Sequence, residues 1–446
     1  MRLNEPCSRN SDHPKTLFKH LKTKFMKKTP IAIALALLVA TFPIHAQSFP
    51  APANASDYEE LPELKASEIL RPDILQGPNH KVRDEVSTSS GANRFIIDST
   101  FGVFEAEGNE MLVRRVNEIN AIAKLKEVSR TDAYKKALVT SAKSQLAAAK
   151  NIITDPVNTA ANVPKGLMKF MGRAGERVKG IGKKREPAPD EGSRAQNIIG
   201  FTAAKRKVAL SLGVDPYSSN DTLQRELDGI TWASFAGGLT FKAATMPIGG
   251  GAGAALTITG LTNTFESMLQ DKSPADLKIM NRKALLEMGT STADADAFLK
   301  STAFSPSEET AFVLNLKSMD GVAGRGAFVA VAAKKSSAEA DAIFCVKTAE
   351  LMARLHQGET PLARITLIED FPVCVAKDGT LVVALQWDSA AWTARADNFA
   401  KTLRAQGKDK TQYLVALSGV ISPRLYQELE SRGFRVQDRL SPGPLR

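Results

Sequence analysis

Histidine, the residue that most often carries acid–base and metal chemistry, is scarce in this chain. After residue 46 only His80 and His356 remain, and neither has a Cys or a second His at metal-ligand spacing. Nucleophilic Ser-His and Cys-His sites also need a placed histidine. We therefore expect no catalytic residue, no metal and no cofactor. We expect His356, near the end of a helix, to be a surface residue stabilised by the helix dipole.

The stretch "DPYSSNDTLQRE" partly resembles a calcium-binding loop in its spacing. It places Asp215, Ser219 and Glu226 at the first, fifth and twelfth positions of such a loop. Tyr217 occupies the third position and Asn220 replaces the glycine of the sixth, so the pattern fails where ligands and a sharp turn are needed. We interpret the stretch as a loop followed by a helix cap.

Two expected strand ends, "LVVALQW" and "YLVALSG", carry polar residues that could bind a small ligand. Ligands of open α/β sheets bind beyond the carboxyl ends of strands. The candidate ligand-binding residues are Trp387, Asp388, Ser418 and Gly419. The alternative is structural: Asp388 or Ser389 caps the next helix, and Trp387 packs in the core.

Cys345 and Cys374 form an even pair in the part of the chain that would be exported. An oxidising compartment favours a disulfide between them, closing a loop of about 30 residues. The alternative is two buried free thiols, because sequence does not give the separation of their Cα atoms.

Residues 336–446 predict an α/β domain. Helical patterns alternate with strand-like runs, and the last strand–helix–strand segment has a connection short enough for a parallel crossover. The expected strands are "ARITLIED", "PVCVA", "TLVVALQW", "QYLVALSG" and "FRVQD".

Residues 196–335 predict a helical block. Asp221, Ser273 and Ser305 stand where helix caps belong, and the two serines are followed by proline, which tolerates the first helical position. Ser422, followed by Pro423, predicts the same kind of cap in the C-terminal domain.

Within this block, residues 235–262 are rich in Gly, Ala and Thr and carry one charge, Lys242. Small residues allow close helix packing, so we expect a buried hairpin of a helix up to about Thr245 and a second helix from about Gly253. The alternative is insertion into a membrane, since the 23 uncharged residues from Ala243 to Phe265 are long enough to span a bilayer.

Residues 82–185 predict a β-hairpin near 82–107 followed by amphipathic helices. The basic stretch 165–185 is typical of a solvated helix edge, with a helix lying on an anionic membrane surface as the alternative. The membrane-surface candidates are Lys165, Lys169, Phe170 and Arg173. Residues 186–195 predict a linker.

The N-terminal 46 residues predict a secretory signal peptide. Lys27 and Lys28 precede an apolar run and the small residue Ala46, and Met26 is the start we favour, with residues 1–25 a mis-assigned extension. No Cys follows the run, so we expect an exported, periplasmic or extracellular protein that is not a lipoprotein. Residues 47–81 predict an extended, Pro-rich lead-in with little structure of its own.

The net charge limits the expected partners. Residues 1–46 carry +6 of the total +11, which leaves a mild +5 for the remainder and gives no reason to expect a nucleic-acid partner. The expected fold class is mixed α+β: an N-terminal β-hairpin, a largely helical central block and a C-terminal α/β domain.

The sequence identifies no activity. The function that it favours is a non-catalytic interaction or scaffold component of the cell envelope with protein partners. The alternatives are a membrane-active protein that uses residues 165–185 and 229–265, and a small-ligand binder or enzyme that uses the C-terminal domain.

Overall fold

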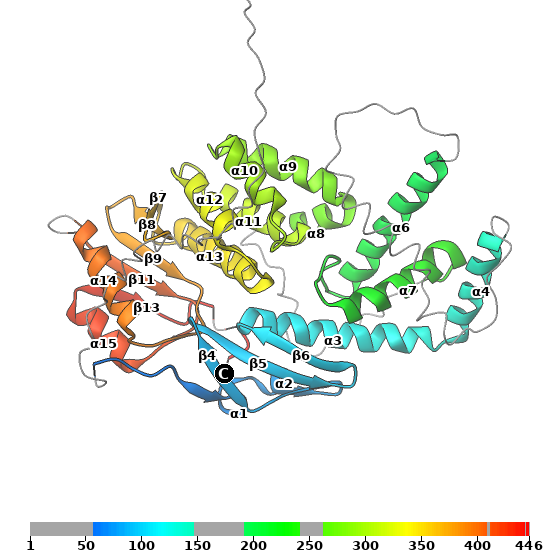
Figure 1. Cartoon of the computed structure of the whole chain (residues 1–446), viewed down its shortest axis with the longest axis horizontal. Coiled ribbons are helices and arrows are strands. Elements are labelled where there is room, and N and C mark those ends of the chain that lie inside the picture. The colour runs from blue at the N-terminus through cyan, green and yellow to red at the C-terminus, as the bar shows by residue number, and fades with distance from the viewer. Residues whose placement is uncertain (1–56, 147–190, 241–261, 408–410, 442, 446) are drawn as a thin grey trace, which may run out of the picture. The chain divides into compact units, whose positions relative to one another are not determined.

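The computed structural model describes residues 57–146, 191–240, 262–407, 411–441 and 443–445. In these residues the fold is mixed α+β, as expected: an N-terminal antiparallel sheet, a central helical block and a C-terminal mixed sheet with helices (Figure 1). The predicted signal peptide, the basic stretch 165–185 and the core of the Gly-rich stretch, residues 241–261, lie outside the described residues.

The N-terminal sheet is larger than the predicted hairpin. Its strands are β1 (Glu63–Lys65), β2 (Gln76–Gly77), β3 (His80–Val82), β4 (Glu85–Ser89), β5 (Ala92–Ser99) and β6 (Gly102–Glu107). Two short helices, α1 (Ala66–Ile69) and α2 (Pro72–Leu75), lie between the first strands. Part of the expected lead-in therefore forms sheet and helix, because Ala66, Leu70 and Ile74 supply fully buried side chains to the core.

The turn between β4 and β5 requires two residues with positive φ. Ser90 and Gly91 both have positive φ, 52° and 86°, which is the requirement of a two-residue hairpin turn. A Cβ atom at Gly91 would lie 2.4 Å from the ring of Trp387, so only glycine fits beneath that ring. The turn thus sets both the hairpin and its contact with the C-terminal domain.

The central block begins with α3 (Asn109–Ser129), which packs on the N-terminal sheet through Leu112, Val116 and Ile119. Helices α4 (Asp132–Leu146), α6 (Glu191–Ser211) and α7 (Asp221–Gly237) share a second apolar cluster with the distal part of α3. Helix α6 begins inside the predicted linker. Helix α7 ends at Gly237 rather than near Thr245, because Gly238 adopts the left-handed conformation that ends helices.

The rest of the block has clear start signals. It comprises α8 (Thr262–Asp271), α9 (Pro274–Glu287), α10 (Thr292–Lys300), α11 (Pro306–Ser318) and α12 (Arg325–Lys335). Ser273 and Ser305 cap α9 and α11 with full capping boxes, as predicted. At α7 the cap is Asn220, one residue before the predicted Asp221, because the Asn220 side chain accepts the N–H groups of Thr222 and Leu223.

The C-terminal sheet has the order β13-β11-β9-β8-β7. The C-terminal domain comprises α13 (Glu339–Gln357), β7 (Leu362–Ile368), β8 (Phe371–Ala376), β9 (Leu381–Leu385), β10 (Ser389–Ala390), α14 (Ala394–Gln406), β11 (Tyr413–Leu417), β12 (Val420–Ile421), α15 (Pro423–Ser431) and β13 (Phe434–Gln437). Strands β10 and β12 pair with each other outside this sheet. Strands β9, β11 and β13 are parallel, as the short strand–helix–strand connection predicts, while β7, β8 and β9 are antiparallel.

Alternating residues of this sheet belong to two cores. Val382 and Ala384 face the core formed with α11, α12 and α13, whereas Leu381 and Val383 face the core formed with α14 and α15. This alternation follows from the two-residue period of a strand. The sheet is therefore covered on both faces, with the central helical block supplying one cover.

Candidate functional site

The predicted ligand residues at the two strand ends lie next to each other. The Ser418 hydroxyl and the Gly419 N–H both donate to the Trp387 carbonyl, each at 2.8 Å. Ser418 is 1% exposed and Asp388 is 5% exposed, so neither side chain faces solvent. Their polar atoms bond instead to backbone groups of the protein itself.

Asp388 holds the C-terminal domain to the N-terminal sheet. Its Oδ2 accepts the backbone N–H groups of Asn93 at 2.9 Å and of Asn109 at 3.0 Å, and Asn109 is the first residue of α3. Its own N–H donates to the Gly91 carbonyl at 2.7 Å. Burial raises the pKa of Asp388 to about 7, although the two N–H donors oppose that rise. The cap of α14 is Thr393, not Asp388 or Ser389.

The two cysteines form no disulfide. Cys345 on α13 and Cys374 on β8 are buried free thiols within the central core. Burial in apolar surroundings raises the pKa of each thiol to about 12, which makes both unreactive.

Both histidines have structural roles in hydrogen bonding. His80 is buried with Nε2 3.0 Å from the Ile74 carbonyl, and burial lowers its pKa. The Nδ1 atom of His356 accepts the Leu362 N–H at 3.1 Å, and partial burial followed by the charge of Lys377 lowers its pKa. His356 lies in the last turn of α13, as expected, and its stabilisation by the helix dipole stays a prediction.

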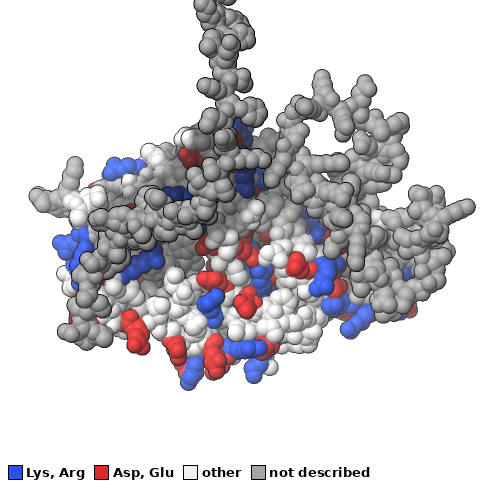
Figure 2. All heavy atoms as spheres, in the orientation of Figure 1, with Lys and Arg blue, Asp and Glu red and all other residues white. Residues whose placement is uncertain are grey.

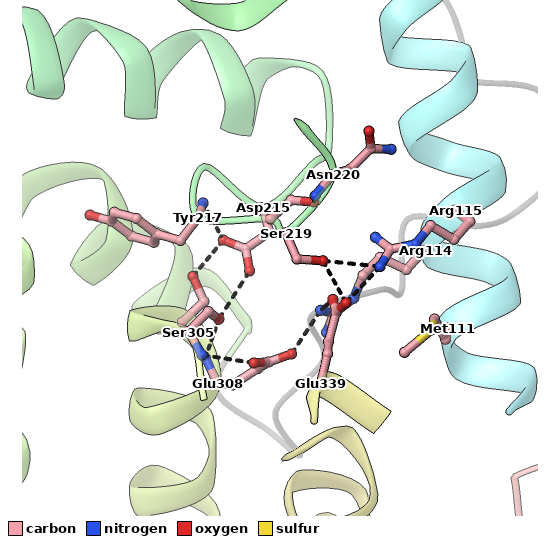
Figure 3. A network of polar contacts seen from close by, with 12 residues as sticks. Met111, Arg114, Arg115, Asp215, Tyr217, Ser219, Asn220, Ser305, Glu308 and Glu339 are labelled. Carbon is pink, nitrogen blue, oxygen red and sulfur yellow. Dashed lines mark hydrogen bonds and ion pairs between the residues drawn. The ribbon is translucent and has the colours of Figure 1, made fainter. Parts of the chain in front are cut away.

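The main concentration of buried charge that sequence reasoning missed lies between α3, α11 and α13 (Figure 3). Arg114 Nη1 lies 2.7 Å from Glu308 Oε1 and 2.9 Å from Glu339 Oε1. Arg115 pairs with Glu118 at 2.8 Å and with Glu339 at 2.6 Å. Glu339 thus bridges two arginines of α3 from the first turn of α13.

The loop 215–220 before α7 completes this ionic network. Ser218 and Ser219 donate to Glu118 and Glu339 through their hydroxyl groups, each at 2.5 Å, and Asn220 Nδ2 donates to Glu118 at 2.9 Å. Asp215 accepts the Ser307 hydroxyl at 2.7 Å and the Tyr217 N–H at 2.9 Å. These bonds fasten the loop to α3, α11 and α13 at once.

The charges of the network are balanced mainly by one another. Burial opposes the charge of Arg114, but Glu308, Asp215 and Glu339 outweigh it and raise the pKa of Arg114. Burial likewise opposes ionisation of Glu339, yet Arg115 and Arg114 outweigh it and lower the pKa of that carboxyl. For Asp215 burial prevails and raises the pKa to about 6. A network with its donors and acceptors paired in this way stabilises geometry, and none of its carboxylates is among the residues that line the neighbouring pocket.

A pocket of about 380 Å³ adjoins the network on the other side of the 215–220 loop. Its walls come from α6, that loop, and the first residues of α7, α9 and α11. The lining residues are Thr202, Lys205, Arg206, Pro216, Tyr217, Ser218, Gln224, Pro274 and Pro306. Figure 3 shows the ring of Tyr217 directed away from the Asp215 carboxylate and from the arginines of α3.

The described part of the chain contains no group of three His, Cys, Asp or Glu side chains placed to hold a metal ion. In the stretch considered as a calcium loop, Asp215 and Ser219 belong to the ionic network, and Glu226 pairs with Lys126 at 2.8 Å. Among the helices whose residues are described, none combines the length and the hydropathy needed to cross a membrane. The membrane-surface candidates Lys165, Lys169, Phe170 and Arg173 lie outside the described residues.

Comparison with known proteins finds no match: no family fits the chain, and no curated protein or solved structure is significantly similar to it. The functional interpretation therefore depends on the geometry alone. Sequence patterns could have suggested the adjacent arginines of α3 as unusual in an apolar helical stretch, but nothing local marks Glu308 and Glu339 as their partners. Arg206 and the pocket carry no sequence signal, because the pocket is formed by separate elements.

Proposed function

We propose that the protein is a non-catalytic, exported component of the cell envelope that acts by holding partners, as an interaction or scaffold protein. The observation that carries this proposal is the ionic network, in which Arg114 and Arg115 pair with Glu118, Glu308 and Glu339. Groups that catalyse proton transfer must reach a substrate. Here the buried charged groups connect α3, α7, α11 and α13, which is what a rigid scaffold requires.

The surface supports a role in contacts with varied protein partners rather than with a polyanion. Figure 2 shows acidic and basic side chains interspersed over the described residues of the visible face. Mixed charges favour solubility and local complementarity, whereas nucleic-acid binding uses extended basic patches. This agrees with the mild charge of the chain after residue 46.

The predicted ligand residues of the C-terminal domain do not support a small-ligand binder or enzyme. Asp388 and Ser418 are engaged by backbone groups of the protein itself, as described above. The membrane-active alternative depends on residues 165–185 and 229–265, of which only 229–240 and 262–265 are described. One experiment decides between it and the scaffold proposal.

The experiment fractionates cells that express the untagged full chain, after treatment of intact cells with a membrane-impermeant lysine cross-linker. The proposal predicts release with the periplasmic fraction, a mature mass matching cleavage near Ala46, and a cross-linked species of defined higher mass. An uncleaved cytoplasmic chain, or a mature chain that stays at monomer mass, contradicts it. Retention through both high salt and alkaline carbonate replaces it with the membrane-active function.

A further inference from the structure

The pocket beside the ionic network contains a buried cation, Arg206, that no carboxylate of the described residues contacts. Arg206 is 5% exposed, yet no carboxylate within the described ranges lies at ion-pair distance from it. Its Nε donates to the Gln270 carbonyl at 3.1 Å, which satisfies one of its five N–H groups. A buried guanidinium without a counterion is costly unless something neutralises it.

Arg206 is the cation of the pocket lining that has no direct carboxylate partner among the described residues. Lys205, the other cation in the lining, pairs with Asp228 at 2.6 Å and is thereby neutralised. Asp276 is near enough to feel the charge of Arg206, but its carboxylate is held by Ser273, the cap of α9. Asp276 keeps its negative charge and acts on Arg206 only from beyond ion-pair distance, so a monoanion in the pocket would make the direct pair that Arg206 lacks.

Tyr217 supplies a second polar group at the same place. Its hydroxyl is buried beside Arg206, whose guanidinium acts on it as a hydrogen-bond donor, and it has no other hydrogen-bond partner among the described residues. Burial, opposed by the charge of Arg206, raises the pKa of Tyr217 to about 12, so the hydroxyl keeps its proton and can donate it. A carboxylate accepts two parallel N–H bonds from a guanidinium and has lone pairs left for such a donor.

Three prolines form the apolar part of the remaining walls, beside the polar side chains of Thr202, Ser218 and Gln224. The rings of Pro216, Pro274 and Pro306 line the pocket, and its volume of about 380 Å³ lies at the lower end of the range of small-molecule sites, roughly 300–1,000 Å³. A ligand that fits has one anionic end and a compact apolar body.

We propose that this pocket binds a small organic monocarboxylate, with the carboxylate against Arg206 and Tyr217 and the apolar body against the three prolines. The ionic network prepares the site, because Asp215, Glu118 and Gln224 hold the loop that carries Tyr217. Gln224 Nε2 donates to the carbonyls of Pro216 at 3.2 Å and Ser218 at 2.9 Å. A preformed wall of this kind lowers the entropy cost of binding. This site goes beyond the scaffold function and does not depend on it.

The test is calorimetric titration of the purified full mature chain with 3-phenylpropanoate and hexanoate, each beside its amide. We expect each carboxylate to bind at least about ten-fold more tightly than its amide, since a charge-assisted bidentate pair is lost in the amide. Arg206→Met should abolish this difference. Arg225→Met, which removes an exposed arginine from α7 next to Gln224, is the matched control and should preserve it.

A second variant keeps the test valid if Arg206→Met does not fold. Tyr217→Phe removes only the hydroxyl and should weaken carboxylate binding by about three- to ten-fold while leaving amide binding unchanged. A peptide ending in phenylalanine, with a free or an amidated carboxyl terminus, distinguishes a free organic acid from a chain terminus as the source of the carboxylate.

Two results overturn the proposal. One is no carboxylate-dependent binding by the unaltered chain at concentrations up to about 10 mM, where a millimolar site would be mostly occupied. The other is equal binding of inorganic phosphate and of the carboxylates, which would show a general anion site without selection for the apolar body. Neither result bears on the cross-linking experiment, so failure of this site and failure of the scaffold function are distinguishable.

Discussion

Arg114 and Arg206 are both nearly excluded from solvent, at 7% and 5% exposure, but their surroundings differ. Arg114 contacts Glu308 and Glu339 from two other helices, and its neighbour Arg115 shares Glu339 and also pairs with Glu118. Arg206 contacts a backbone carbonyl and a pocket.

The comparison separates two uses of a buried cation. A cation that pairs with carboxylates of the same chain fixes elements in place, and its loss leaves those carboxylates buried without a partner. A cation that lacks an internal counterion costs the folded state energy and is suited to an external anion. Removal of the charge should therefore cost much more stability at Arg114 than at Arg206.

The largest effect is expected at the paired site. Arg114→Met should lower the free energy of unfolding by about 3–5 kcal/mol, because Glu308 and Glu339 lose a buried partner. Urea titration monitored by circular dichroism measures the loss. Arg83→Met, which breaks the exposed pair with Asp98 on the N-terminal sheet, is the control and should change stability little. An Arg114→Met protein as stable as this control would refute the structural role of the network.

The next effect concerns Asp388, a buried carboxylate that pairs with no cation in the described part of the chain. Asp388→Ala should cost about 2–4 kcal/mol, because it leaves the buried N–H groups of Asn93 and Asn109 without an acceptor. Asp388→Asn retains a carbonyl oxygen at the same place and should cost much less. Equal losses for the two variants, measured by urea unfolding at low pH, would show that these hydrogen bonds are unimportant.

Asp388 also predicts a pH dependence with a definite sign. Its pKa in the folded state, about 7, lies above the unfolded value, so its favourable contribution is present below about pH 4 and is lost as the pH rises towards 7. Asp388→Asn removes this loss and should gain on the order of 2 kcal/mol relative to the unaltered protein between about pH 4.5 and pH 7.5.

Unfolding free energies of both proteins at these two pH values check the prediction. An unchanged difference between the proteins at the two pH values would contradict it. Asp215 and Glu309, whose pKa values burial raises to about 6 and about 8, act in the same direction and remain in both proteins. Glu339 acts in the opposite direction, because its lowered pKa gives stability that is lost as the pH falls.

The smallest effect is expected from the cysteines. Because Cys345 and Cys374 are separate buried thiols, a reducing agent should leave the unfolding midpoint unchanged. Both thiols should react with an alkylating agent only after urea unfolding, as counted by mass spectrometry. A midpoint that falls under reducing conditions would indicate that the protein contains a disulfide after all.

The features that could be predicted from the sequence are those that depend on residues close together in the chain. Ser273, Ser305 and Ser422 were identified as helix caps because a hydroxyl reaches an N–H three residues ahead, and the bond is local. The strands of the C-terminal sheet followed from short apolar runs and turn residues. The error at α7, where Asn220 rather than Asp221 caps the helix, is a choice between two adjacent residues that can both accept the bond.

Sequence could not predict the contacts that join distant segments. Asp388 bonds to residues 93 and 109, and Arg114 pairs with residues 308 and 339, so these partners meet only after the sheets and helices have packed. The same reason hid the pocket, whose lining comes from four helices and a loop. A strand-end rule led to Asp388 and Ser418, which do lie together, but packing of the N-terminal sheet covers Asp388.

The most direct test of the difference between the two buried cations compares Arg114→Met with Arg206→Met by urea unfolding at neutral pH without ligand. The account predicts that Arg114→Met is less stable than Arg206→Met by about 3 kcal/mol or more, since only Arg114→Met leaves buried carboxylates without a partner. Arg206→Met should differ from the unaltered protein by about 1 kcal/mol or less, because it loses a single hydrogen bond and a desolvated charge. Equal losses, or a larger loss for Arg206→Met, would contradict the assignment of Arg114 to structure and of Arg206 to ligand binding.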